Sequence, residues 1–248
     1  MLASTNQNFL QSPKTKYKCN VCKDTGSVLF LVEDECVSTP EEKVMVERWG
    51  DCDCLKEKKY RDMYERAGIS KIFENCTFKN FTLKGKPAAI KTAKQTAEDF
   101  VKEYDGKHSI AFLGQVGSGK THLCIAIANE LLKKLVGVLY MQYREVLTQL
   151  KQNITDDEFY QKEIHKYKTA PVLYIDDLYK GKITDSDKNI IFEIINYRYL
   201  NMRPIIISTE FSCERLLDFD EAIGSRIIQM CKGYIIELSG LDLNHRLL

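Results

Sequence analysis

The sequence has 248 residues, of which 44% are apolar and 29% charged, a composition typical of a globular protein with one or two domains. The net charge of +1 excludes a general attraction for nucleic acid, so any such binding requires a local basic patch. No stretch approaches the roughly 20 apolar residues of a membrane span, and Met1 to Lys18 lacks the apolar core of a secretory signal. We therefore expect a cytoplasmic protein without a membrane partner, whose cysteines are thiols or metal ligands.

The amino-terminal region combines a polar tail with a small cysteine-containing segment. Residues 1–16 are polar and predict a disordered tail. Two cysteine pairs follow, a C-x-x-C knuckle and a tighter C-x-C, formed by Cys19, Cys22, Cys52 and Cys54. Four thiolates satisfy the tetrahedral coordination of zinc and leave no open position, so they predict a structural zinc site. The competing interpretation is a redox C-x-x-C, but the βαβ setting usual for such a motif is missing.

Two apolar runs between the cysteine pairs, 28–32 and 44–49, predict a β-hairpin. The segment is too short to bury enough surface alone, so metal binding would supply much of its folding energy. A charged helix over 55–66 and an apolar lead-in segment over 69–81 follow. Pro87 then precedes a helix over 88–104 with a regular apolar face.

Residues 114–121 fit the pattern G-x-x-x-x-G-K-[ST] of a phosphate-binding loop. An apolar strand over 108–113 precedes the loop and a helix over 121–135 follows it, which is the setting that the motif requires. The glycines allow backbone N–H groups to surround phosphates, Lys120 would reach the β- and γ-phosphates, and Thr121 would ligate Mg²⁺. We therefore assign nucleotide contacts to Gly114, Gly117, Ser118, Gly119, Lys120, Thr121 and His122. The alternative is a glycine-rich turn that matches by chance.

A second strand is expected over 138–142, followed by two polar helices within 143–169. These helices carry the basic residues Arg144, Lys151, Lys162, His165, Lys166 and Lys168. A solvated helix face is the simplest interpretation, and a surface that faces DNA phosphates is the alternative.

A second nucleotide signature lies about 55 residues after the phosphate loop, where an apolar strand over 171–175 ends in two acids. Asp176 would hold Mg²⁺, and Asp177 would orient and polarise the attacking water. Acids that merely end a strand are the alternative. The next residues, Lys180-Gly181-Lys182, predict an exposed basic turn.

The remaining chain predicts a long helix through Leu200 that Asp185 or Ser186 caps, a buried strand over 203–209, helices over 211–217 and 220–231, and a last strand over 233–238. Four or five buried strands thus alternate with helices, and polar groups follow their carboxyl ends. This order predicts an α/β fold with a parallel, doubly wound sheet of the P-loop kind.

Over residues 17–248 the sequence resembles the AAA+ ATPases, and within them the DnaC/DnaI-type replicative helicase loaders. The resemblance rests on the phosphate loop and on the segments 174–178, 206–209 and 224–227. The C-x-x-C-x-D-T-G start with a later C-x-C resembles the zinc-binding module of Gram-positive and phage members. Transposition helper ATPases of the IstB type share the core, but the zinc module favours loaders.

Together with the polar tail (1–16), this resemblance divides the chain into a disordered tail (1–16), a zinc module (17–58), a linker and lead-in segment (59–85) and an AAA+ domain (86–248). It implies an ATPase that uses ATP and Mg²⁺, carries Zn²⁺, docks on the replicative helicase hexamer, binds single-stranded DNA and self-associates. A transposition helper that binds duplex DNA, or a nucleotide-gated adaptor with little turnover, are the alternatives.

The resemblance also assigns further roles. The polar end of the strand at Ser208-Thr209 matches the sensor of the γ-phosphate. Glu210 stands where many relatives have Asn, so either Thr209 does the sensing or Glu210 acts through water, and hydrolysis could be slow. Arg226 matches the arginine finger that reaches the ATP of a neighbouring subunit, although an ordinary surface arginine is the alternative. Arg246 would be a second sensor, but the helical lid that usually supports it is almost absent. The implied catalytic residues are Lys120, Asp176, Asp177, Thr209 and Arg226.

Overall fold

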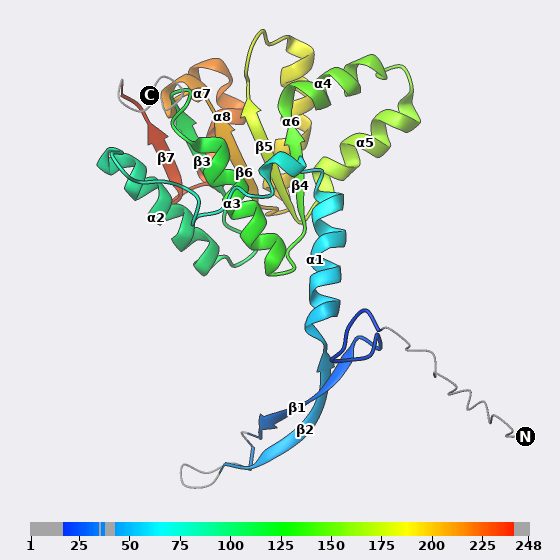
Figure 1. The fold of residues 1–248 in the computed structure, drawn as a ribbon. Coiled ribbons are helices and arrows are strands. Elements are labelled where there is room, and N and C mark those ends of the chain that lie inside the picture. The colour runs from blue at the N-terminus through cyan, green and yellow to red at the C-terminus, as the bar shows by residue number, and fades with distance from the viewer. Residues whose placement is uncertain (1–16, 35, 38–42, 241–248) are drawn as a thin grey trace, which may run out of the picture. The chain divides into compact units, whose positions relative to one another are not determined.

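A computed structural model describes residues 17–34, 36–37 and 43–240 (Figure 1). The predicted tail and Arg246 lie outside these residues. The chain forms two compact units, Met1–Lys59 and Tyr60–Leu248, which divide within helix α1 (Asp53–Ala67). Every helix in the described part of the chain is too short or too polar to span a bilayer.

The first unit is built on the predicted β-hairpin. Strands β1 (Ser27–Glu33) and β2 (Met45–Asp51) pair antiparallel, with Leu29 opposite Trp49 and Leu31 opposite Glu47. The Cys52 N–H donates to the Gly26 carbonyl (2.8 Å) and so joins the end of β2 to the start of β1. Because a two-stranded sheet has no second layer, its apolar residues stay exposed: Leu31 is 66% exposed and Trp49 is 74% exposed.

The second unit contains a five-stranded parallel sheet with the strand order β4-β5-β6-β3-β7, as the alternation of strands and helices predicted. Its strands are β3 (Ile110–Gly114), β4 (Val138–Gln142), β5 (Val172–Leu178), β6 (Ile205–Thr209) and β7 (Ile235–Leu238). Because all five run the same way, their carboxyl ends meet at one edge of the sheet. The phosphate loop and both acids therefore lie at that edge.

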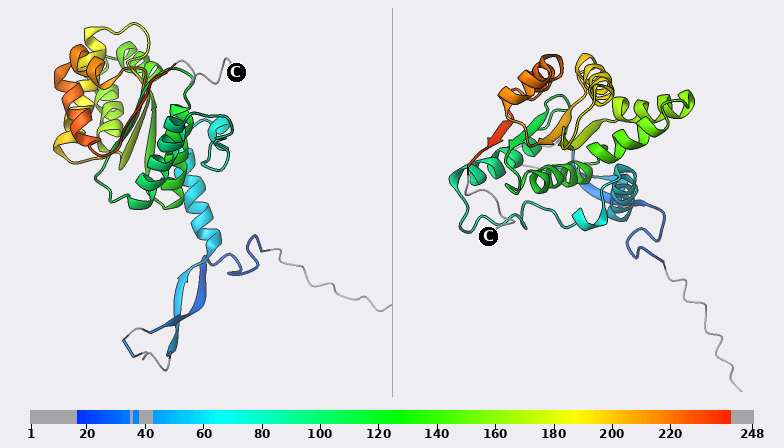
Figure 2. Two further views of the ribbon diagram at one scale, coloured as in Figure 1. Left: turned by 90° about the vertical axis from the view of Figure 1, so that its left-hand side faces the viewer. Right: turned by 90° about the horizontal axis from the view of Figure 1, so that it is seen from above.

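Helices cover both faces of this sheet (Figures 1 and 2). They are η1 (Lys71–Phe73), α2 (Ala88–Glu103), α3 (Lys120–Lys133), α4 (Tyr143–Gln152), α5 (Asp157–Thr169), α6 (Asp185–Leu200), α7 (Cys213–Phe219) and α8 (Glu221–Met230). Alternate strand residues enter two separate cores. Ile110, Phe112 and Ile206 pack with α2 and α3, whereas Ala111, Leu113 and Ile207 pack with α4 to α8. Such strands are buried on both faces, which explains their continuous apolar sequence.

Two helix starts differ from the sequence prediction, and capping explains both. Thr184, rather than Asp185 or Ser186, caps α6, because it forms a reciprocal capping box with Asp187. Helix α7 begins at Cys213 instead of 211, since the Ser212 hydroxyl accepts a hydrogen bond from the Arg215 N–H (3.1 Å).

The lead-in segment before α2 packs on α3. The Asn129 side-chain amide donates to the Cys76 carbonyl (3.0 Å), and His122 Nε2 lies 3.0 Å from the Thr77 carbonyl oxygen. Phe81 is 4% exposed and contacts the His122 ring edge-to-face. These contacts hold the lead-in segment against α3, whose first residues follow the phosphate loop.

A fully buried arginine holds the ends of several elements together. Arg198, on α6, donates to the carbonyls of Tyr167 (2.9 Å), Ala170 (2.9 Å) and Pro204 (2.6 Å). Burial lowers the pKa of Arg198 to about 9, which still leaves the guanidinium charged at neutral pH. One planar cation thus satisfies the backbone carbonyls at the end of α5 and the carbonyl just before β6.

We expect Arg198→Met to lower the free energy of unfolding by about 3 kcal/mol or more, because several buried carbonyls would lose their donor. Urea denaturation measures this loss. Arg215→Met is the matched control, since Arg215 is exposed on α7 and its replacement should cost less than about 1 kcal/mol. Equal midpoints for the two variants would contradict the role given to Arg198.

Candidate functional site

The phosphate loop needs glycine for reasons that the structure makes explicit. Gly114, Gly117 and Gly119 have φ values of 102°, 77° and 91°, in the left-handed region. A Cβ atom on Gly114 would lie 2.2 Å from the Leu238 carbonyl oxygen, and one on Gly119 would lie 2.8 Å from the Phe81 ring. The loop is therefore held tightly between β7 and the lead-in segment.

Lys120 follows the loop and points back into it. Its Nζ atom donates to the carbonyls of Gly114 (2.8 Å) and Gln115 (2.6 Å), and the residue is only 6% exposed. Burial lowers the pKa of Lys120, and the nearby carboxylates of Glu210 and Asp177 oppose this effect. The ammonium is thus a partly desolvated cation at the mouth of the loop, where an anion would attract it.

Asp176 lies at the carboxyl end of β5 and accepts four hydroxyl hydrogen bonds. Its Oδ1 accepts from Tyr174 (2.6 Å), Ser208 (2.5 Å) and Thr121 (3.1 Å), and its Oδ2 accepts from Tyr140 (3.0 Å). The two predicted magnesium ligands, Thr121 and Asp176, are therefore in direct contact. Carboxylate and hydroxyl oxygens are the ligand types that Mg²⁺ prefers, so this pair fits that ion.

Sequence reasoning did not find three of these hydroxyls as site residues. Tyr174 precedes Asp176 by two residues and so points to the same face of β5, a signal that strand alternation could have supplied. Tyr140 is the register partner of Tyr174 on β4. Ser208 lies on β6, and its Oγ also accepts from the Asp177 N–H (2.9 Å). The last two depend on strand pairing, which the sequence alone does not fix.

The turn after β5 differs from the predicted exposed basic turn. Gly181 and Lys182 are exposed, but the side chain of Lys180 returns to the site. Its Nζ lies 2.7 Å from Asp177 Oδ2 and 3.3 Å from Glu210 Oε1. The hydrogen bond to Asp177 raises the pKa of Lys180, so the ammonium stays charged.

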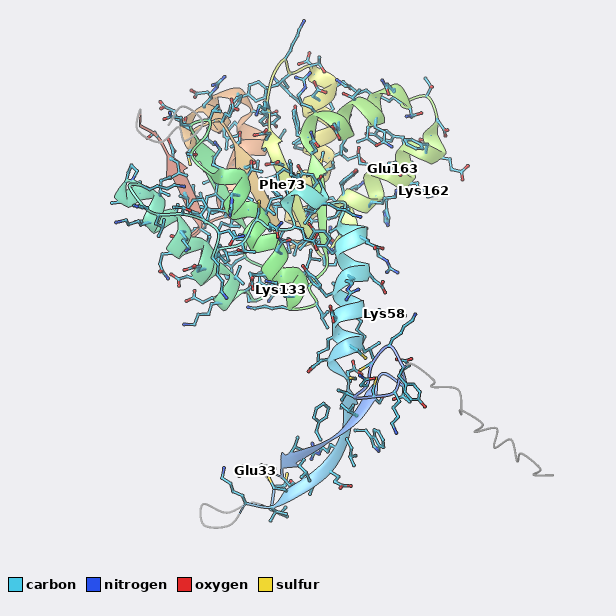
Figure 3. All side chains as sticks on the ribbon, viewed as in Figure 1. Glu33, Lys58, Phe73, Lys133, Lys162 and Glu163 are labelled. Carbon is cyan, nitrogen blue, oxygen red and sulfur yellow. The ribbon has the colours of Figure 1, made fainter. Side chains whose placement is uncertain are left out.

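A cleft of about 500 Å³ joins these groups. It is lined by the phosphate loop, by both acids of β5 and by Tyr140, Lys180 and Glu210. Phe73 of η1, labelled in Figure 3, and Cys76 line it from the lead-in segment. The cleft thus brings together the predicted residues Gly117, Gly119, Lys120, Thr121, His122, Asp176 and Asp177.

Two predicted catalytic residues, Thr209 and Arg226, are not among the described residues that line the cleft. The Thr209 hydroxyl is buried, donates to the Leu178 carbonyl (2.7 Å) and accepts from the Phe211 N–H (3.2 Å). Its neighbour Glu210 lines the cleft instead. Arg226 lies on α8, where its Nε donates to the Asn196 side chain (3.1 Å).

The guanidinium of Arg226 also lies over two aromatic rings of α6, at 5.3 Å from the Phe192 centroid and 5.6 Å from that of Tyr199. These contacts orient the guanidinium of an arginine that is half-exposed.

Several basic residues of α4 and α5 are already paired with acids. Lys151 contacts Asp187 (2.7 Å), Lys168 contacts Glu193 (2.9 Å), and Lys166 contacts Glu163. Lys162, labelled with Glu163 in Figure 3, is exposed on α5. This pairing leaves less positive charge for a phosphate backbone than the sequence indicated.

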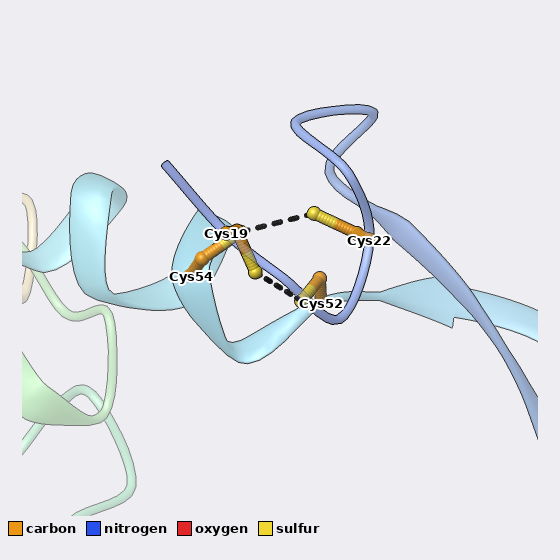
Figure 4. Close-up of side chains that lie close together, drawn as sticks. All are labelled: Cys19, Cys22, Cys52 and Cys54. Atoms are coloured by element: carbon orange, nitrogen blue, oxygen red, sulfur yellow. Dashed lines mark hydrogen bonds between the residues drawn. The ribbon is translucent and has the colours of Figure 1, made fainter. Parts of the chain in front are cut away.

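The four predicted cysteines of the first unit form one cluster (Figure 4). Their sulfur atoms all lie within 4.8 Å of one another, with 3.8 Å between Cys19 and Cys52 and 3.4 Å between Cys22 and Cys54. A tetrahedral zinc site with Zn–S bonds of about 2.3 Å requires sulfurs about 3.8 Å apart. The cluster therefore fits zinc, whereas a disulfide would need sulfurs about 2.05 Å apart.

Asp24 supports this cluster without being a ligand. Its carboxylate accepts hydrogen bonds from the backbone N–H groups of Cys19 (2.8 Å) and Lys18 (3.1 Å). The Gly26 N–H donates to the Cys22 sulfur (3.4 Å). These bonds fix the loop that presents the first two sulfurs, as outer-shell contacts do in metal sites.

Comparisons with known proteins agree with this geometry. The family described as IstB-like ATP binding protein matches residues 54–229. The phage-like element PBSX protein XkdC of Bacillus subtilis (strain 168) is 38% identical over 96% of this chain and 89% of its own. The replicative helicase loader DnaC of Escherichia coli (strain K12) is 28% identical over 68% of each chain. A crystal structure of DnaI matches with a TM-score of 0.56 and 26% identity, covering 71% of this chain and 94% of that one.

The family match covers most of the second unit and thus the whole cleft. The parallel sheet and phosphate loop agree with the AAA+ fold expected from the sequence. The chain therefore belongs to the IstB-like ATP-binding protein family and is a DnaC-like ATPase with the AAA+ fold.

Proposed function

We propose that this ATPase loads the replicative DNA helicase. One observation carries the proposal: a four-cysteine module and a phosphate-loop cleft occur in the same chain. The similarity to DnaC, which is named as a replicative helicase loader, supports it. The IstB-like family match lies within 54–229 and does not include the first three cluster cysteines, so the core alone does not separate loaders from transposition helpers.

In this proposal the cleft binds ATP with its phosphates on the loop. Lys120 would exchange its two loop carbonyls for the β- and γ-phosphates, which are stronger acceptors. Thr121 and Asp176 would hold Mg²⁺, which when bound neutralises phosphate charge. Asp177 would orient the attacking water and accept its proton, since its carboxylate lines the cleft beside Asp176.

The sensor of the γ-phosphate and the arginine finger remain to be assigned. Glu210 faces the cleft and Thr209 does not, so we assign the sensing position to Glu210. Arg226 would act on the ATP of a neighbouring subunit, which requires self-association. Its contacts with Phe192 and Asn196 support this role because they orient the guanidinium before a neighbour arrives.

The first unit would carry zinc on its four cysteines and dock on the helicase. Its hairpin presents an apolar face formed by Leu29, Leu31 and Trp49, which alternate to the same side of the paired strands. An exposed apolar face of this kind is typical of a protein interface. Single-stranded DNA would bind the second unit, and ATP hydrolysis would then release the loader.

Asp177→Asn should lower steady-state ATP hydrolysis by about 10²- to 10⁴-fold, the usual contribution of a general base. ATP binding should remain, since Lys120 and the loop are unchanged. Asp185→Asn is the matched control, because Asp185 is exposed in the first turn of α6. Unchanged turnover in Asp177→Asn would contradict the assignment, and a wild type without turnover would favour a nucleotide-gated adaptor.

The variant Leu31→Ser with Trp49→Ala should keep about one zinc per chain, as metal analysis measures, because neither residue is a ligand. Its affinity for the host replicative helicase hexamer should fall by about tenfold or more, since central aromatic residues dominate interfaces. Cys22→Ser with Cys54→Ser should lose both the metal and the helicase.

Leu200→Ser is the matched control for the hairpin variant, because Leu200 is 68% exposed on α6. Helicase affinity that is the same for the wild type and the hairpin variant would overturn the docking face. A wild type without zinc would remove the metal from the proposal and leave the docking result to be judged on its own.

A further inference from the structure

The end of β5 and the turn that follows it contain an unusual run of left-handed backbone. Asp177, at the irregular end of the strand, and Tyr179 and Gly181 have φ values of 54°, 63° and 88°, so three of five consecutive residues lie in the left-handed region. For residues other than glycine this conformation costs roughly 1–3 kcal/mol each, and it persists only where the surroundings enforce it. Strained backbone of this kind is typical of active sites and ligand-binding sites.

Packing on both sides enforces the shape of this turn. The Tyr179 side chain is 2% exposed and packs against the rings of Phe211 and Phe219. Arg144 donates to the Lys180 carbonyl (3.2 Å), and a Cβ atom on Gly181 would lie only 2.0 Å from the Arg144 guanidinium. The turn therefore cannot relax without moving Tyr179 out of the aromatic cluster, and the side chain of Arg144 lies against its other side.

The consequence of this shape is the position of the Lys180 ammonium. It lies between Asp177 Oδ2 (2.7 Å) and Glu210 Oε1 (3.3 Å), and all three groups line the nucleotide cleft. Glu210 alone would place an extra negative charge beside bound phosphates. Lys180 offsets that charge, so the residue that departs from the family pattern comes with its own counter-ion.

We propose that Lys180 is a second phosphate-binding cation of the cleft, which distinguishes ATP from ADP by moving from Asp177 to the γ-phosphate. The inference rests on the ATP-binding mode given under the proposed function and names the regulation of that site. While Lys180 binds Asp177 Oδ2, that oxygen is occupied by the ammonium and is not free to accept a hydrogen bond from the attacking water. Transfer of the ammonium to a phosphate oxygen frees it, so the triphosphate itself makes the carboxylate available to the water.

The chemistry of the groups favours this exchange. A γ-phosphate carries more negative charge than one carboxylate and offers three acceptor oxygens, and a lysine has a flexible stem with three donors. Glu210 Oε1 lies 3.3 Å from the ammonium and would keep it inside the cleft during the movement. Lys120 is held by the loop carbonyls on the other side, so two cations would share the charge of the phosphates.

The test compares the affinities of the full-length protein for fluorescent ADP and for a fluorescent, non-hydrolysable ATP analogue, both with Mg²⁺. In Lys180→Met the affinity for the ATP analogue should fall by about tenfold or more, as expected for loss of one hydrogen bond to a charged group. The affinity for ADP should change by less than about twofold, because the contact is to the γ-phosphate. Lys182→Met is the matched control, since Lys182 is exposed in the same turn.

Adding Glu210→Gln to Lys180→Met should restore part of the affinity for the ATP analogue, because it removes the uncompensated carboxylate. An equal loss for both nucleotides, or no loss for either, would overturn the role of Lys180. Failure of the proposed function gives a different result: neither nucleotide would bind the wild type, or Lys120→Ala would bind both as well as the wild type does.

Discussion

The carboxylate of Asp176 is the contact on which the nucleotide site depends. It is 6% exposed, and a charge so buried is tolerated only when hydrogen bonds satisfy it. The four hydroxyls that do so come from β4, β5, β6 and α3. One acid thus links the carboxyl ends of three central strands to the helix that follows the phosphate loop. The same arrangement leaves oxygen ligands at the sheet edge, where Mg²⁺ is expected.

Charge balance in the cleft links this geometry to regulation. Lys180 is paired with Asp177 and Glu210, whereas Lys120 is held by the carbonyls of Gly114 and Gln115, so both cations have partners before any phosphate arrives. In the proposed account, ATP hydrolysis is restrained until a bound triphosphate moves Lys180 away from Asp177. Such restraint suits a protein whose hydrolysis should follow the arrival of a partner. The first unit, with its cysteine cluster and exposed apolar face, would bring that partner.

The parts of the site that local sequence motifs specify could be predicted, and the parts that depend on tertiary pairing could not. Glycine spacing located the phosphate loop, and cysteine spacing located the cluster. Strand pairing decided that Ser208 meets Asp176 while Thr209 turns to Leu178. Left-handed backbone at Asp177 and Tyr179, which favours glycine, brought Lys180 into the cleft against the expected exposed turn. No periodicity or composition signals that conformation.

Native mass spectrometry of the full-length chain, mixed with the replicative helicase hexamer of its host, tests the central claim most directly. The mixture is measured with and without ATP. We predict a discrete complex of the hexamer with several copies of this chain, whose stability changes when ATP is present. Absence of any complex in both states would contradict the loader function and favour a transposition helper, for which duplex DNA is the next partner to test.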